Sequence, residues 1–366
     1  MITFTPSEEQ NMLIEAIHRY AESDVRKIAH DADETGEAPA AVVNKGWELG
    51  ILPGLIPEAY GGYADGPGAV TGALALEEMA WGDLSIALKV WTPALFALAI
   101  LTSGTEEQKQ AYLPAFCDVK RPIATAALVE PSVTFDPWRP AVIATRNNGM
   151  VALDGEKASV PLAAEAEQMI VYASDSETGK VDGYIVEKGA QGLEICGREK
   201  LMGLRALPTY RIKLSNVTVN ASQRVGGEAG TDFATILNRG RIALGALAVG
   251  VARGSFEYAR DYAKERVQFG VPIATKQAIA FKLADMAIEV DAARLLVWEA
   301  AWQADQGNDL MASAAQVKAY INQMVMFVAD SGVQTLGGYG YIREYPAERW
   351  LRNARAFASI DGLALV

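Results

Sequence analysis

The chain has 366 residues, of which 50% are hydrophobic and 21% are charged, and its formal net charge is −12. This length suits two or three packed units, and the acidic balance argues against nucleic acid and anionic membranes as partners. The two cysteines and two histidines form no cluster, which argues against a disulfide framework and a zinc site.

The first part of the chain shows helical periodicity up to about residue 115. Thr5-Pro6-Ser7-Glu8 predicts a helix start in which Thr5 is the cap and Glu8 completes a capping box. No signal peptide is predicted, and the longest apolar run, Val90 to Leu101, contains Pro93 and is too short to span a bilayer. We therefore expect a cytoplasmic protein without membrane insertion. Further helices are predicted over residues 42–49, 69–81, 85–102 and 106–115.

Strand patterns replace helical ones after Pro122. Val142–Thr145 and Val151–Leu153 are predicted strands, and Asn148-Gly149 between them is a strong hairpin turn. Asp154-Gly155 predicts another turn directly afterwards. Further strands are predicted over residues 170–173, 183–186 and 211–214.

Long helices return from Asp232 onward. Three glycines in the first of them, Gly245, Gly250 and Gly254, predict close packing against neighbouring helices. Two more long helices are predicted over residues 275–307 and 310–336.

The predicted elements divide the chain into three domains. Residues 1–119 form an N-terminal helical domain, residues 120–228 a middle β domain, and residues 229–366 a C-terminal four-helix bundle. Helices, then strands, then helices is an α+β order and not an alternating one.

Two later stretches share glycine-rich turns. Tyr262–Ile273 has the sequence YAKERVQFGVPI, and the segment from Ser331 contains a turn with Gly337, Gly338 and Gly340. Glycine allows backbone to approach a ligand closely because it has no Cβ. Together the two stretches resemble the acyl-CoA dehydrogenase family, which has an arginine, glutamine, phenylalanine, glycine pattern in the first and a glutamine, glycine, glycine pattern in the second. The resemblance covers nearly the whole chain.

This resemblance implies a flavoprotein that oxidises acyl-CoA thioesters and passes electrons to an electron-transfer flavoprotein. A carboxylate removes the proton α to the thioester carbonyl, and FAD takes the hydride from the β carbon. In the family each FAD lies across a subunit interface. The flavin ring and the base belong to one subunit, and the neighbour holds much of the pyrophosphate and adenosine end.

The residues that the resemblance assigns to the neighbour's half of the FAD site are all present. They are Arg266, Gln268, Phe269, Gln334, Gly337 and Gly338. Arg266 offers a permanent cation suited to a pyrophosphate, Phe269 offers an apolar face, and the two glycines offer bare backbone.

The half that holds the flavin ring departs from the family pattern. Val129 replaces a hydrogen-bonding threonine, and Phe135 places a bulky ring where the family has a serine. Ser159 replaces the aromatic beside the flavin, and Pro161 replaces a threonine and lacks a backbone N–H.

Asp361 occupies the position of the catalytic glutamate. Aspartate is shorter by one methylene, or roughly 1 Å, and a misplacement of that size costs on the order of a hundredfold in rate. Some relatives, including nitroalkane oxidases, use aspartate here, so Asp361 stays a weak candidate base. Other relatives carry the base directly before Arg241, where this chain has Gly240.

These departures predict a subunit of a heterotetrameric α2β2 acyl-CoA dehydrogenase that supplies half of the FAD site to a catalytic partner. The expected partner is a second acyl-CoA dehydrogenase-like chain, and self-association is the alternative. The family includes such enzymes in lipid and steroid side-chain catabolism. One alternative is a complete flavoenzyme with Asp361 as its base, either an unusual acyl-CoA dehydrogenase or a nitroalkane-type oxidase. Another is a scaffold or binding protein of the same fold without flavin.

Overall fold

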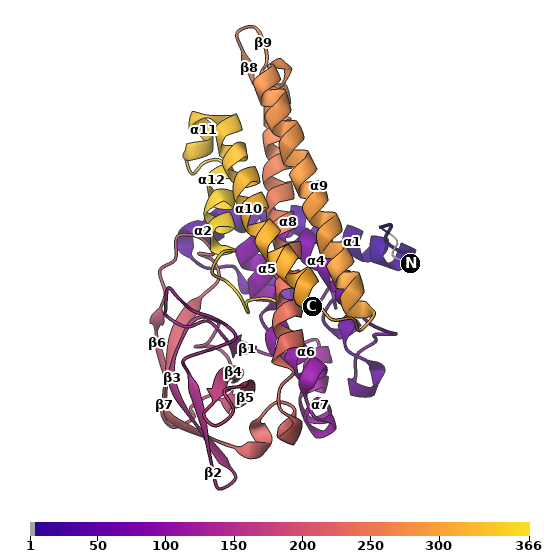
Figure 1. Ribbon diagram of the computed structural model, residues 1–366. Coiled ribbons are helices and arrows are strands. Elements are labelled where there is room, and N and C mark those ends of the chain that lie inside the picture. The colour runs from indigo at the N-terminus through magenta and orange to yellow at the C-terminus, as the bar shows by residue number, and fades with distance from the viewer. Residues whose placement is uncertain (1–3) are drawn as a thin grey trace.

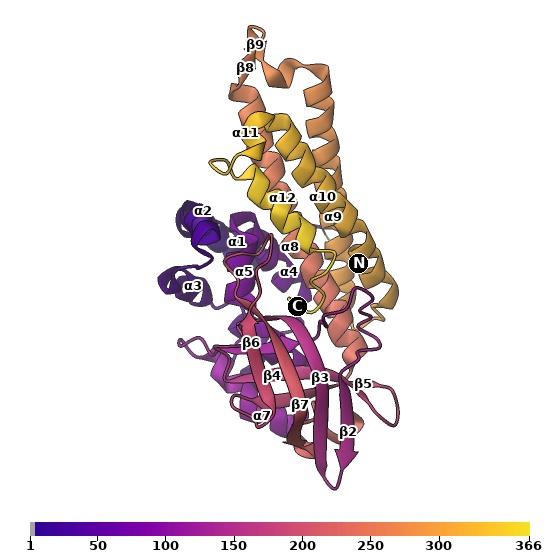
Figure 2. The ribbon, with the colours of Figure 1, turned by 90° about the vertical axis from the view of Figure 1, so that its left-hand side faces the viewer.

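The computed structural model describes residues 4–366, which form a helical N-terminal part, a curled sheet and a long helical bundle. In Figures 1 and 2 the bundle rises to one side of the sheet, and the N-terminal helices pack against the lower half of the bundle. This arrangement confirms the predicted α+β fold class.

Seven α-helices make up most of the N-terminal part from residue 4 onward, and the start of the first follows from local sequence. The true cap of the first helix is Ser7, whose side chain accepts the Gln10 N–H while the Gln10 side chain accepts the Ser7 N–H. The prediction of a Thr5 cap with Glu8 was therefore wrong by two residues, because Ser7 and not Thr5 has the extended backbone next to the first helical turn. The helices are α1 (Glu8–Tyr20), α2 (Arg26–Thr35), α3 (Ala40–Trp47), α4 (Ala69–Gly82), α5 (Leu84–Trp91), α6 (Ala94–Ser103) and α7 (Glu106–Tyr112).

One predicted helix is two helices in the structure. The apolar pattern over residues 85–102 predicted one element, but α5 ends at Trp91 and α6 begins at Ala94, with a bend of 50° between them. Pro93 explains the break, because proline lacks the N–H that would continue the helical hydrogen bonds. The bend leaves Trp91 and Leu95 buried in the centre of the molecule.

The sheet has seven strands in the order β1-β4-β2-β3-β7-β6, and β5 also pairs with β4. β4 pairs in parallel with β1 and β2, and the other pairs are antiparallel. The strands are β1 (Ala124–Ala127), β2 (Ile143–Asn147), β3 (Met150–Pro161), β4 (Gln168–Asp175), β5 (Val181–Glu187), β6 (Leu193–Arg198) and β7 (Thr209–Asn220).

The two turns predicted around β3 have different outcomes. The hairpin at Asn148-Gly149 is confirmed, with both residues at positive φ between paired Asn147 and Met150. The second turn, at Asp154-Gly155, is wrong, because β3 continues through it. The pairing with β7 shifts register between Leu153 and Gly155, and a Cβ on Gly155 would lie 2.9 Å from the Val142 side chain. Gly155 therefore allows a bulge at a close backbone approach.

The bundle contains the longest helices of the chain. Gly245 and Gly250 in α8 pack closely against neighbouring helices, as predicted. A Cβ added to Gly245 would lie 2.6 Å from the Val317 side chain, and one added to Gly250 would lie 2.2 Å from the Glu77 carbonyl oxygen. A two-stranded hairpin, β8 (Val267–Gln268) with β9 (Val271–Pro272), forms its far tip (Figure 1). The helices are α8 (Phe233–Glu265), α9 (Gln277–Asp305), α10 (Met311–Leu336), α11 (Gly338–Tyr341) and α12 (Ala347–Ala356).

Apolar length alone does not make α8 a membrane helix. Within residues 4–366, α8 and the bent α5–α6 pair meet a length-and-composition test for a span, but 78% of the apolar stretch of α8 is buried inside the protein. α8 is the core helix that α4, α9 and α10 surround.

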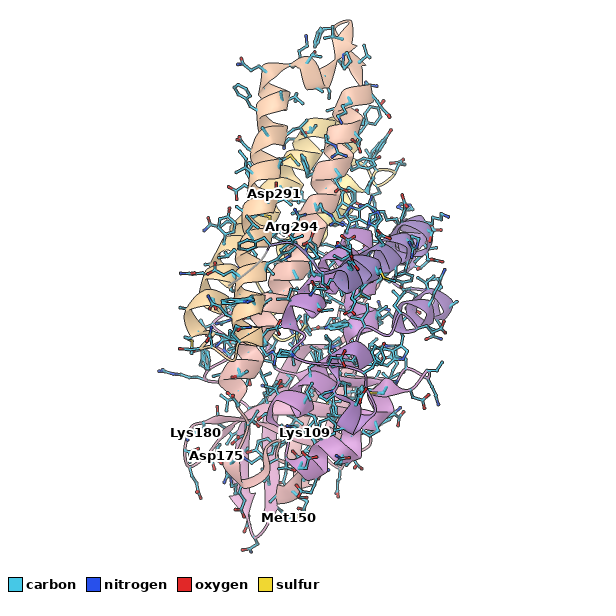
Figure 3. All side chains as sticks on the ribbon, turned by 90° about the vertical axis from the view of Figure 1, so that its right-hand side faces the viewer. Lys109, Met150, Asp175, Lys180, Asp291 and Arg294 are labelled. Carbon is cyan, nitrogen blue, oxygen red and sulfur yellow. The ribbon has the colours of Figure 1, made fainter. Side chains whose placement is uncertain are left out.

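A buried ionic network ties the N-terminal helices to the bundle. Arg253 on α8 donates to Glu77 at 2.9 Å and to Glu78 at 2.6 Å, both on α4. Arg294 on α9 also donates to Glu77, at 3.0 Å, and pairs with Asp291 one turn away (Figure 3). These contacts fix α4, α8 and α9 together, and α8 also lines both of the pockets described below.

Candidate active site

An open cavity of about 380 Å³ lies where the end of α8 meets the end of α10. Five of the six residues predicted to hold the neighbour's cofactor line it, although they come from two segments about 70 positions apart. We call this cavity the outer pocket, and its defining residues are Tyr262, Arg266, Gln268, Gln334, Gly337 and Gly338.

Local backbone structure aims these groups at one space. Arg266 caps α8, with its N–H donating to the Tyr262 carbonyl at 2.8 Å. Gly337 ends α10 at φ 61°, a conformation that glycine adopts without strain. Apart from adjacent residues and the backbone of the same helix, no atom of residues 4–366 lies within 4 Å of where a Cβ would be on Gly337 or Gly338. The glycines therefore present bare backbone to open space.

The guanidinium of Arg266 lies over an aromatic ring and has no carboxylate partner within residues 4–366. Its central carbon is 5.2 Å from the centroid of the Tyr339 ring, and Tyr262 packs edge-on against the same ring. Stacking on a ring orients a guanidinium and leaves its donors available. Arg266 is thus a free cation beside bare backbone, which is a donor set suited to a phosphate or pyrophosphate.

Phe269 is the one predicted cofactor residue outside the outer pocket. It lies at the tip of the β8–β9 hairpin and is 91% exposed. Phe269 and Gly270 both have positive φ, 55° and 80°, as a two-residue hairpin turn requires. Phenylalanine is strained there. Within one chain its ring contacts only the Lys276 ammonium among the described ring and cation pairs, at 5.8 Å, so it points outward and away from its own pocket.

The second candidate region lies between the sheet and the bundle, where the flavin ring was predicted. The Val129 carbonyl accepts the Ala158 N–H at 2.8 Å, and the Ser159 N–H donates to Glu199 at 3.0 Å. Pro161 has no N–H. Of these three β3 backbone N–H positions, the Ala158 and Ser159 N–H groups are paired within the chain and the one at Pro161 is missing.

A buried ion pair fixes the same edge of the sheet. The Lys157 ammonium is fully buried and donates to the Leu128 carbonyl and to Glu130, both at 2.9 Å. Glu130 also accepts the N–H groups of Ala141 and Val142. Burial lowers the pKa of Lys157 to about 8, although Glu130 opposes this shift. The pair satisfies every polar atom it brings inside, which is the arrangement of a structural element.

Asp361, the weak candidate base, is held by two cations. Its Oδ1 lies 2.8 Å from Lys318 Nζ, and its Oδ2 lies 3.7 Å from Arg241 Nη2. Lys318 is itself fixed by donating to the Phe357 carbonyl at 2.7 Å. All three side chains are at most 17% exposed. Asp361 therefore acts in this structure as the centre of an ionic clamp between α8, α10 and the segment that follows α12.

Beside Asp361 lies a small apolar cavity, which we call the inner pocket. Its walls come from α6, α8, the sheet and the segment after Asp361, and the residues that define it are Leu95, Leu128, Tyr172, Phe233, Gly240 and Leu365. The volume left open is only about 20 Å³. Phe135, predicted to obstruct the flavin side, is half-buried and packs against the same apolar core.

The sequence interpretation missed two residues that shape these regions. Tyr339 follows directly after Gly337-Gly338 in the sequence. An aromatic residue next to two glycines that were expected to approach a ligand could have been predicted to contribute to the same site. Lys318 lies among buried Ala314, Val317 and Ile321 of α10, and a lysine within an apolar helical face signals a buried partner.

Comparisons with known proteins agree along the whole chain. Models of the acyl-CoA dehydrogenase N-terminal, middle and C-terminal domains match residues 7–120, 125–217 and 230–364. A probable acyl-CoA dehydrogenase of Bacillus subtilis, YngJ, is 36% identical over 99% of this chain and 96% of its own length. The caffeyl-CoA reductase-Etf complex subunit CarC of Acetobacterium woodii is 33% identical over 98% of this chain and 96% of its length. The structure of butyryl-CoA dehydrogenase from Megasphaera elsdenii superposes with a TM-score of 0.90 at 31% identity, covering 99% of this chain and 96% of that one. The chain belongs to the acyl-CoA dehydrogenase family.

Proposed function

We propose that this chain is a subunit of an FAD-dependent acyl-CoA dehydrogenase that supplies its outer pocket to FAD held by a catalytic partner chain. The partner is a second acyl-CoA dehydrogenase-like chain in an α2β2 assembly, and the complex desaturates an acyl-CoA thioester between its α and β carbons. It is cytoplasmic and passes electrons to an electron-transfer flavoprotein. The relative from Acetobacterium woodii, named as a subunit of a complex with Etf, supports that acceptor.

The observation that carries this proposal is the contrast between the two pockets of one chain. The outer pocket is open, with about 380 Å³ of space, and the inner pocket retains about 20 Å³. Ligand pockets for molecules of cofactor or drug size measure about 300–1,000 Å³. A chain that used its own flavin and acyl sites would need room in the second region and not only in the first.

The outer pocket fits one end of FAD, which is the cofactor of this family. Arg266 would take a pyrophosphate oxygen, and the Gln268 and Gln334 amides would donate to neighbouring oxygens. Gly337 and Gly338 would let the cofactor lie against the backbone. FAD, when bound, supplies the acceptor for the substrate hydride. Phe269, projecting outward at the hairpin tip, would cover part of the cofactor from across the interface.

The flavin-ring side of this chain does not fit the cofactor in the same way. The Ser159 N–H is bound to Glu199, Pro161 offers none, and no hydroxyl replaces the threonine at Val129. We therefore expect the purified chain alone to bind far less than one FAD per chain, and the complex to hold one FAD per pair of chains.

Arg266→Ala, made in the complex with the partner, tests the proposal. Charge-assisted hydrogen bonds are worth about 1.5–3 kcal/mol, so FAD affinity should fall about ten- to a hundredfold. The loss should appear as FAD release on dilution, with turnover restored by excess FAD. Flavin absorbance after gel filtration measures it directly and does not depend on activity.

Two controls separate the cofactor role from a general effect. Arg260 lies on the same helix, and its guanidinium pairs with neighbouring Asp261 at 2.8 Å. Arg260→Ala removes this guanidinium and should leave the FAD content unchanged. Substituting the corresponding arginine of the partner should matter far less than Arg266→Ala. Equal FAD loss from both arginines would show that both kinds of site are filled, and would overturn the proposal.

A further inference from the structure

The inner pocket is closed because the chain fills it with its own residues. The remaining volume of about 20 Å³ is close to the 10–15 Å³ that a single water needs. The segment after Asp361 supplies the filling: Leu363, Ala364, Leu365 and Val366 are between 1% and 4% exposed. In both Figure 1 and Figure 2, residue 366 lies at the centre of the molecule, between sheet and bundle.

Specific contacts hold this segment in place. Gly362, at φ 82°, turns the chain inward against Leu128, where an added Cβ would lie 2.8 Å from the Leu128 side chain. Trp91 donates its indole N–H to the Leu365 carbonyl at 2.9 Å. Val366 packs over Gly72 of α4, at 3.3 Å from a Cβ placed on that glycine. The segment therefore reaches from the sheet to the two central helices α4 and α5.

The space it fills is the space that a reacting acyl chain would need. A base must lie within hydrogen-bond reach of the carbon-bound proton that it removes. Of the two positions considered for the base, Gly240 lines the inner pocket, and Asp361 directly precedes Gly362, which also lines it. The Ala364 carbonyl lies 3.0 Å from where a Cβ on Gly240 would be. An acyl chain presented to either position would have to lie where residues 363–366 now lie.

We infer that the segment Gly362–Val366 is a built-in plug that takes the place of the acyl chain and closes the inner pocket to acyl-CoA. Its leucine and valine side chains give the pocket the apolar filling that an acyl chain would otherwise provide. The ionic clamp on Asp361 anchors one end of the plug, and the Trp91 hydrogen bond anchors the other. This inference rests on the proposed function and assigns substrate binding in the complex to the partner alone.

The test uses butyryl-CoA and the complex of the two full chains. Calorimetric titration should give one butyryl-CoA per pair of chains. Hydrogen exchange followed by mass spectrometry should show that a peptide covering residues 360–366 changes its protection by less than twofold at saturation. Two butyryl-CoA molecules per pair, or a tenfold loss of protection in that peptide on ligand addition, would overturn the plug.

A variant checks that the anchor at Trp91 is real. Trp91→Phe keeps an aromatic ring but removes the donor to the Leu365 carbonyl, so exchange of the same peptide should rise several-fold while FAD content stays constant. Unchanged exchange in Trp91→Phe would contradict the anchoring. FAD counting separates the two levels of inference: two FAD per pair defeats the proposed function, whereas one FAD with two butyryl-CoA per pair defeats the plug alone.

Discussion

Charged side chains lie in both the outer pocket and the inner region, but within residues 4–366 they are free in the first and have partners in the second. In the outer pocket Arg266 has no carboxylate partner within the described chain, and Gly337 and Gly338 face open space. In the inner region the charges of Lys157 and Asp361 are both paired inside the chain. Unpaired donors beside open backbone indicate a surface kept for a ligand, and charges that lie beside a partner inside the chain indicate packing within the protein. Asp361 Oδ1 is an exception in part, because it lies near Lys318 but accepts no hydrogen bond from the described residues.

Under the proposed function, the comparison means that the two halves of a shared cofactor site diverge separately. The outer pocket lies at the ends of α8 and α10, far from the sheet, and the inner pocket depends on the sheet, α6 and the segment after α12. α8 contributes to both pockets, but its residues in the inner pocket lie near its start and those in the outer pocket lie near its end, so we expect substitutions at one pocket to leave the other unchanged. A chain in an assembly can keep one half for its partner while the other half serves only stability.

The largest expected effect on stability comes from breaking the buried Lys157–Glu130 ion pair at the edge of the sheet. Glu130→Ala leaves the Lys157 ammonium without its carboxylate and removes the acceptor of two backbone N–H groups. We expect the free energy of unfolding to fall by about 3–5 kcal/mol, measured by urea denaturation. Glu156 is exposed and lies next to Lys157 on β3. Glu156→Ala should change the free energy of unfolding by less than about 0.5 kcal/mol. Similar effects from both would contradict the view of this edge as converted core.

A smaller loss of stability is expected when the ionic clamp at Asp361 is weakened. The same substitution tests whether Asp361 has a structural or a catalytic role. Asp361→Asn weakens the contacts to Lys318 and Arg241, so the free energy of unfolding should fall by about 1–3 kcal/mol. Turnover of the complex should stay within twofold of the unsubstituted complex, and exposed Asp65→Asn is the matched control. A loss of several orders of magnitude in turnover with the fold intact would make Asp361 the base and favour the complete-flavoenzyme alternative.

The smallest effect concerns the ring beneath Arg266. Tyr339→Leu removes a cation–π contact worth about 0.5–1 kcal/mol at an exposed site, so FAD retention by the complex should weaken about two- to fivefold. Equilibrium dialysis against free FAD measures the change. Tyr341→Leu, two positions along and 83% exposed, lies outside the residues lining the outer pocket and should have no effect. Equal weakening by both substitutions would mean that the ring beneath Arg266 has no special part in holding the cofactor.

The sequence by itself predicted most of the elements and, through the family resemblance, five of the residues that line the outer pocket. The glycines of α8, the Asn148-Gly149 turn and the two motifs around Arg266 and Gly337 depend on local backbone preferences or short spacings. Such features are readable one segment at a time, because the physical cause lies within a few residues. They do not establish that the six predicted residues bind FAD, which remains a prediction for the Arg266→Ala experiment.

Only the tertiary structure decided what the inner region became. The clamp joins Lys318 to Asp361 across 43 positions, and the plug brings Leu365 to Trp91 from the far end of the chain. The bulge at Gly155 likewise depends on the approach of Val142 from another strand. In each case the energy comes from a partner that is distant in sequence, so local patterns gave a turn at Gly155 and a weak base at Asp361. Packing made Gly155 a bulge and placed Asp361 between Lys318 and Arg241, and the part of Asp361 in catalysis stays a prediction for the Asp361→Asn experiment.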